Sequence, residues 1–166
     1  MLKVRLAVMS LAIAMMLPLV SVLQAQAPPA PIPSQILTAK KVFISNAGVE
    51  FETGLWKGGS AQPYNELYAA IKVGGQYEIV AAPADADLVF QISLADPASR
   101  LKSSIESPQI ELLLLDPKTH IVLWTLGQDV SVSHAQIGRN HALKEALSKL
   151  IGDLKALTSQ PAPAAK

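Results

Sequence analysis

The chain has 166 residues, half of them hydrophobic, and contains no cysteine. The missing thiols exclude disulfides, cysteine nucleophiles, cysteine-rich zinc sites, iron–sulfur clusters and lipid attachment at a cysteine. The 14 basic and 13 acidic residues nearly balance. No basic run is long enough to follow a phosphate backbone, so the composition argues against nucleic acid as a partner.

Residues 1–27 have the three parts of a secretory signal peptide. Lys3 and Arg5 form the positive start, an apolar run follows, and Ala25-Gln26-Ala27 supplies the small residues that signal peptidase accepts. We predict cleavage after either alanine, no membrane span in the mature chain, and export to the periplasm or out of the cell. The alternative is an uncleaved membrane anchor, because the apolar run approaches the ~20 residues that span a bilayer.

Proline-rich segments enclose the part of the chain that we expect to fold. Residues 28–38 contain closely spaced prolines, which neither pair in a sheet nor continue a helix, so this range is predicted to be a semi-stiff linker. Residues 158–166 have a similar composition and are predicted to be a disordered tail. The range between them, 39–157, is predicted to be one domain of ordinary size.

Hydrophobic periodicity predicts the elements of that domain. In chain order we expect a strand at 41–46, a helix that begins at Pro63 and ends at Gly74-Gly75, strands at 77–81, 88–94, 109–115 and 121–133, and a helix at 139–157. Each helix has one apolar stripe and each strand at least one apolar face. This pattern predicts a single two-layer α+β domain, in which two helices pack on one face of a mostly antiparallel sheet. The first two strands, joined by a helix, allow a parallel pairing.

The predicted hairpin has more apolar surface than one helix layer can cover. Leu112–Leu115 and Ile121–Trp124 are unbroken apolar runs, so both faces of the sheet are apolar near the turn in either register. The second face is either covered by the loop at 46–62 or by the linker, or it binds a protein partner or a second copy. The candidate residues for such a surface are Leu113, Leu115, Ile121 and Leu123.

The glycine-rich loop provides a second candidate surface. Trp56 lies there beside Lys57, and no local pattern predicts that the indole is buried. It either anchors a ligand or partner or forms a lid over the second sheet face. Trp124, in contrast, is in phase with the apolar residues of its strand and is predicted to lie in the core.

The chemically active side chains lack the spacing that catalysis or metal binding requires. Ser60 lies in GGSAQ, where glutamine replaces the second glycine of a nucleophile elbow, so a role at the start of the next helix is predicted. His120 follows the hairpin turn, where a histidine tolerates an unusual backbone angle. Asp85 and Asp87 are expected to cap or flank the strand that follows. We predict no catalytic residue, no cofactor and no metal, and therefore a protein that is not an enzyme.

The runs ADLVFQISL and IELLLLDPKTHIVLWTL, followed by an amphipathic helix, resemble uncharacterised secreted bacterial proteins. More distantly, they resemble envelope domains of the TolB N-terminal type, the curli secretion component and lipoprotein activators of penicillin-binding proteins. In those families a strand begins with Ala-Asp, and a turn reading Asp-x-x-Thr-Gly precedes an aliphatic-Trp strand. The matching residues are Ala86-Asp87, Asp116, Thr119 and Leu123-Trp124, with His120 in place of the turn glycine.

The resemblance implies a non-enzymatic accessory or adaptor module that binds protein partners of the cell envelope. The missing cysteine departs from the lipoproteins among these families. The alternative function is binding of a small molecule or glycan by the loop Phe51–Ser60.

Overall fold

The computed structural model describes residues 30–49, 59–95, 108–131 and 136–160. The predicted signal peptide, both cleavage sites, Trp56 and Lys57 lie outside these ranges. In chain order the elements are α1 (Ser34–Thr38), β1 (Lys41–Val49), η2 (Gly59–Ala61), α2 (Gln62–Gly74), β2 (Glu78–Ile79), η3 (Pro83–Asp85), β3 (Leu88–Ala95), β4 (Gln109–Leu115), β5 (Val122–Asp129) and α4 (Gln136–Thr158).

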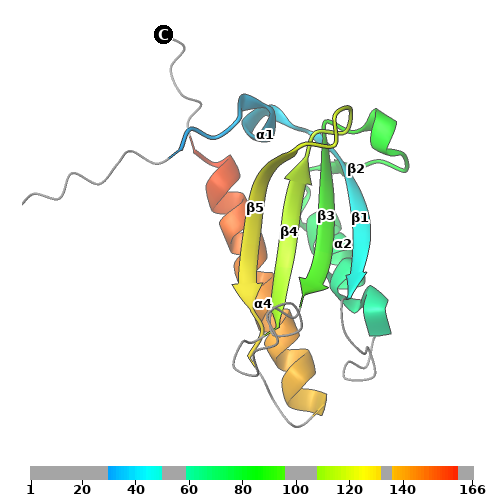
Figure 1. Ribbon diagram of the computed structural model, residues 1–166, viewed down its shortest axis with the longest axis vertical. Helices are drawn as coiled ribbons and strands as arrows, with labels where there is room; N and C mark the ends of the chain where they lie inside the picture. Colours follow the sequence, from blue (N-terminus) through cyan, green and yellow to red (C-terminus); the bar gives the residue numbers. More distant parts are fainter. Residues whose placement is uncertain (1–29, 50–58, 96–107, 132–135, 161–166) are drawn as a thin grey trace, which may run out of the picture. The chain divides into compact units, whose positions relative to one another are not determined.

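The five strands form one mixed sheet with the order β2-β1-β3-β4-β5 (Figure 1). β1 pairs in parallel with β2 and with β3, whereas β3–β4 and β4–β5 are antiparallel. Helix α2 between the first two strands makes their parallel pairing possible, because parallel strands need a crossover connection. The predicted α+β fold is confirmed, with a sheet that is antiparallel in its β3–β4–β5 half and parallel around β1.

α2 and α4 cover one face of the sheet and pack against each other (Figure 1). α2 has proline in its first turn and is capped after Gly74 by Gly75, which has a left-handed conformation (φ 63°) and donates its N–H to the carbonyl of Ile71. The apolar stripes of the two helices meet alternate residues of the central strands. The largest side chains buried there are Leu67, Leu88, Phe90, Ile92, Leu94, Ile110, Leu112, Leu114, Leu143, Leu150 and Leu154.

The folded region extends beyond the predicted limits of 39–157 at both ends. α1 lies within the range predicted to be linker, and Ile36 is only 1% exposed and belongs to the core. The prolines end at Pro33, so the following residues are free to form a helical turn. At the other end, α4 includes Thr158, whose hydroxyl accepts a hydrogen bond from Gln76 (3.0 Å).

Candidate functional site

The sheet face opposite α2 and α4, here called the open face, carries neither long helix (Figure 1). Four apolar residues, one from each of β1, β3, β4 and β5, are aligned across it by the strand register. These residues, here called the apolar row, are Phe43, Val89, Leu115 and Val122. Val89 is buried between its neighbours, Phe43 and Leu115 are half-buried, and Val122 is 46% exposed.

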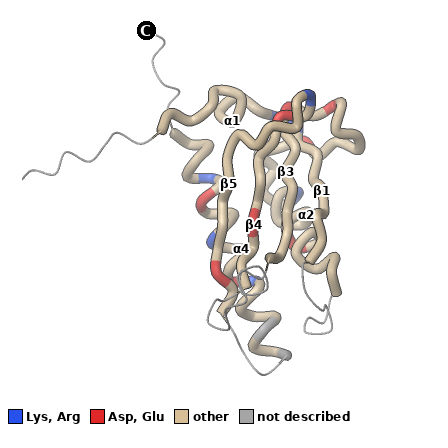
Figure 2. Tube along the Cα trace, viewed as in Figure 1, with Lys and Arg blue, Asp and Glu red and all other residues tan. Residues whose placement is uncertain are grey.

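The open face becomes polar with distance from the hairpin turn. The next register line holds Leu113 among Ser45, Gln91 and Thr125, and the line after it holds Ser93, Glu111 and Gly127. Figure 2 shows few charged residues along these strands. The apolar part of the open face is therefore a patch at one end of the sheet, with a polar border.

The predicted surface residues have different positions in the structure. Leu113 and Leu115 lie on the open face, and Ile121, at the hairpin turn, is 61% exposed. A bulge between Leu114 and Leu115 brings Val122 rather than Leu123 opposite Leu115. Leu123 is partly buried and packs against the core.

Sequence reasoning missed Phe43 and Val89 as members of this surface. Phe43 lies between the buried residues Val42 and Ile44, and Val89 lies between Leu88 and Phe90. In a strand the intervening residue points to the opposite face. The alternation within each strand therefore contained the signal, but the register that aligns the two residues came only with the structure.

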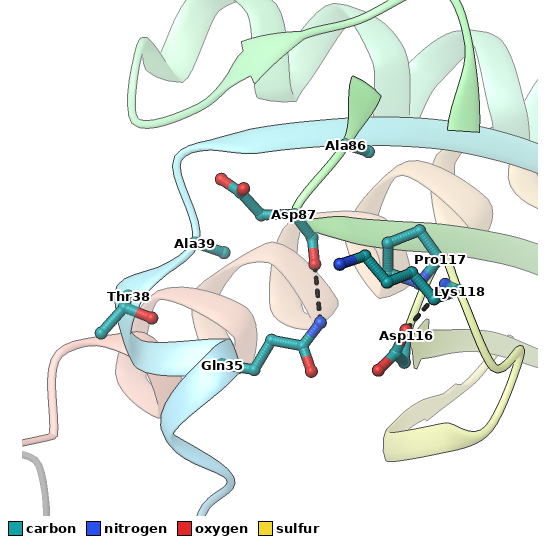
Figure 3. A pocket seen from close by; sticks show the side chains of 8 residues that line it. All are labelled: Gln35, Thr38, Ala39, Ala86, Asp87, Asp116, Pro117 and Lys118. Carbon is teal, nitrogen blue, oxygen red and sulfur yellow. Dashed lines mark hydrogen bonds between the residues drawn. The ribbon is translucent and has the colours of Figure 1, made fainter. Parts of the chain in front are cut away.

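A polar pocket of about 420 Å³ lies at the end of the sheet where β3 begins (Figure 3). The Asp87 carboxylate accepts hydrogen bonds from the backbone N–H groups of Lys40 and Lys41, both at 2.8 Å. These two bonds stabilise the ionised form, so the pKa of Asp87 lies below its usual value. The expectation that this residue caps the start of a strand is confirmed for Asp87, which joins the beginning of β1 to that of β3.

The second carboxylate of the pocket also has a structural partner. Asp116 accepts hydrogen bonds from the backbone N–H groups of Lys118 (2.7 Å) and Thr119 (3.2 Å), which stabilises the hairpin turn. Figure 3 shows that the carboxyl groups of Asp87 and Asp116 point in different directions. Both acids of the pocket wall therefore stabilise local backbone structure.

The remaining polar candidates are dispersed in the described part of the chain. Ser60 lies in η2, before α2, but the N-cap residue of that helix is Ala61 and no side chain bonds to the cap, so the structure shows no capping role for Ser60. His120 has a φ of 57°, which confirms the unusual backbone angle predicted for the turn. Within the described ranges, no group of three or more potential metal ligands comes together.

Trp124 packs against the core from β5, as predicted, although its side chain is only partly buried. A further hollow of about 370 Å³ lies between α2 and α4, where Lys144 and Glu66 form an ion pair (3.6 Å). The Lys144 side chain is 63% exposed and that of Glu66 is 37% exposed, so water screens this pair and it contributes little to stability. The predicted Phe51–Ser60 ligand loop falls almost entirely on residues that the structure does not describe.

No protein-family model and no curated protein matches the sequence. Among solved structures, the chain is similar to a dodecameric PelC variant from Paraburkholderia phytofirmans, with 15% identity and a TM-score of 0.49 over 79% of this chain and 94% of the other. It is also similar to a protein described as a neuraminyllactose-binding hemagglutinin homolog from Helicobacter pylori, with 11% identity, a TM-score of 0.44, and coverage of 81% and 92%.

A third similar structure is the protein XCC0632 from Xanthomonas campestris, with 15% identity and a TM-score of 0.40 over 78% of this chain and 89% of the other. The comparisons do not show the TolB, curli or penicillin-binding-protein-activator resemblance. In the described ranges, no helix is both long enough and apolar enough to cross a membrane.

Proposed function

We propose that this protein is an exported, non-enzymatic accessory module of the cell envelope that binds a protein partner through its apolar row. The observation that carries the proposal is the position of that row. It lies on the sheet face opposite both long helices and ends in Val122, which is 46% exposed, beside Ile121, which is 61% exposed. Contiguous apolar patches of this kind with a polar border are typical of protein interfaces.

The shape of the open face favours a protein partner over a small ligand. The apolar row crosses four strands of a sheet, which gives a broad surface rather than an enclosed cavity. Small-molecule sites are concave and bury most of the ligand. Of the two hollows described above, the one near Asp87 and Asp116 is polar and lies at the end of the sheet, and the other lies between α2 and α4.

The test is in-cell crosslinking of a C-terminally tagged chain in its native host. A photo-reactive amino acid replaces the exposed Val122, and the captured partner is identified by mass spectrometry. We expect one reproducible envelope protein, and we expect Leu115→Asp to abolish its capture because a carboxylate in the row opposes desolvation. The same analysis reports the mature N-terminus and therefore tests the predicted cleavage.

Ser148→Asp is the matched control, because it adds the same charge at an exposed position of α4, away from the open face. This variant should capture the partner as well as the wild-type chain does. Equal capture by the Leu115→Asp chain, with an unchanged circular dichroism spectrum, would contradict the proposal. Stabilisation by a sugar or metabolite in a thermal-shift screen, with no partner captured, would favour the small-ligand alternative.

A further inference from the structure

β5 is the outermost strand of the sheet, and within the described residues no strand pairs with its outer side (Figure 1). Its eight residues include no lysine, arginine or proline, and Asp129 is their one charged residue. Charged side chains, proline and very short length are the usual protections of an edge strand. The opposite edge, β2, has only two residues and is protected by its length.

The ladder between β4 and β5 shows which backbone groups of β5 remain free. The N–H of Val130 donates to the carbonyl of Pro108 (2.7 Å), so this pair is one of the hydrogen-bonded pairs of the ladder. Such pairs recur at every second residue of an antiparallel ladder. The backbone groups of Trp124, Leu126 and Gln128 therefore point toward β4, whereas those of Thr125 and Gly127 point outward. Both outward residues are exposed.

Gly127 has no role inside the fold that requires glycine. Its φ is not positive, and a β-carbon added there would meet nothing nearer than the Ile110 carbonyl oxygen at 3.8 Å, an ordinary contact. Glycine in a strand interior weakens the strand and often marks a place where another backbone approaches closely. The free backbone at Gly127 lies on the outer edge, so that approach would come from outside the protomer.

We propose that β5 pairs in antiparallel register with β5 of a second copy of this chain, with Leu126 on the two-fold axis. In this register Thr125 lies opposite Gly127 of the second copy, and the two residues exchange backbone hydrogen bonds. Leu126, now partly buried on the helix-covered side, meets its own counterpart, which adds apolar contact.

Charge favours the antiparallel arrangement over the parallel one. A parallel pair would place the two Asp129 carboxylates side by side, and like charges opposite each other destabilise a sheet. In the antiparallel register each Asp129 lies opposite an apolar residue, Leu123. This dimer uses the edge of the sheet, whereas the proposed partner uses the apolar row, so the two proposals stand independently.

The mass of the purified mature protein, measured by light scattering coupled to size-exclusion chromatography, tests this proposal. We expect a dimer for the wild-type chain and half that mass for Thr125→Pro, which removes an outward N–H that the protomer does not use. Thr125→Val keeps the N–H and the side-chain shape, and it should remain a dimer. A monomeric wild-type chain or a dimeric Thr125→Pro chain would overturn the proposal.

Cysteine crosslinking gives a second test that does not depend on the proline variant. The chain has no cysteine, so each introduced thiol is the only one. Residues on the two-fold axis of a non-hydrogen-bonded pair have Cα atoms about 4.5 Å apart, within the range that a disulfide bridges. Under oxidising conditions Leu126→Cys should form a covalent dimer, and Ser148→Cys on α4 should not.

Equal crosslinking by the two cysteine variants, or none by Leu126→Cys, would contradict the β5 pairing. Leu115→Asp separates this interface from the proposed partner site, because it should abolish partner capture and leave the dimer mass unchanged. Loss of the dimer in Leu115→Asp, together with a dimeric Thr125→Pro, would place the self-association on the open face and overturn the edge pairing.

Discussion

The two faces of β4 differ in what covers them, although both are rich in leucine. Ile110, Leu112 and Leu114 are fully buried beneath the helix layer. Glu111, Leu113 and Leu115, on the other side of the same strand, are only half-buried. Because side chains alternate along a strand, one seven-residue segment supplies both the centre of the core and part of an exposed apolar surface. A run of leucines in this chain is therefore not evidence of burial on both sides.

This difference has an energetic consequence. The covered side contributes stability through burial and close packing, whereas the half-exposed side has lost less contact with water and contributes less. Leucine at 113 and 115 is thus poorly explained by the stability of the protomer alone. Contact of these two leucines with another molecule would explain their presence, and this argument is the basis of the proposed function.

The sharpest test of the difference between the two faces of β4 compares Leu112→Ala with Leu113→Ala. The two residues are neighbours, and the chemical change is the same. Leu112→Ala leaves a cavity in a fully buried site and should lower the free energy of unfolding by about 2–5 kcal/mol. Leu113→Ala removes a half-exposed side chain and should cost about 1 kcal/mol or less. Urea unfolding followed by circular dichroism measures both values. Equal losses would mean that the open face is covered as well as the helix-packed face.

A smaller effect is expected at the end of the sheet where β1 and β3 begin, because Asp87 holds the two strands in the register that forms the apolar row. Asp87→Ala removes the acceptor for two backbone N–H groups, and we expect a loss of about 1 kcal/mol at neutral pH. Urea unfolding also measures this change, and Asp85→Ala, at an exposed position two residues away, is the control.

The pH dependence of this variant has a definite sign. The folded-state pKa of Asp87 is lowered from 3.8, chiefly by the hydrogen bonds from Lys40 and Lys41. The ionised Asp87 carboxylate therefore stabilises the folded protein fully at pH values well above 3.8. This stabilisation is lost as the pH falls through the lower folded-state pKa. The stability difference between wild type and Asp87→Ala should narrow on acidification below 3.8. A constant difference would show that the carboxylate charge is unimportant.

The order and type of the main elements could be predicted from the sequence, because each has a strong periodic signal or a clear end. The stripe of α2 and its closing glycines, and the alternation of β3, identify their elements locally. The position of Leu123 could not be predicted, because the bulge opposite Leu115 depends on how the hairpin turn joins its strands. α1 was also missed, since a five-residue helix after prolines is stabilised by the tertiary burial of Ile36 rather than by a local pattern.

The open face shows the same limit at the level of function. Leu113, Leu115 and Ile121 could be chosen because their run is apolar in either register. Phe43 and Val89 join them only through pairings between strands that are distant in the sequence. A binding surface that spans a sheet is a property of the strand register, so a single sequence indicates some of its members and not their arrangement.

The smallest effect on stability is expected at the hairpin turn, which joins β4 to β5. His120 has a left-handed backbone (φ 57°) that costs most L-residues roughly 1–2 kcal/mol. His120→Gly removes this strain but adds unfolded-state entropy, so we expect a net gain of about 0.5 kcal/mol, measured as a small rise in Tm. His120→Ala keeps the β-carbon and should give no gain. Because His120 is exposed and the substitution leaves the leucines of both faces unchanged, the glycine variant should capture the partner and dimerise as the wild-type chain does. A change in either property would mean that the turn itself contributes to the interface, and that the two faces of the sheet are not the only surfaces to compare.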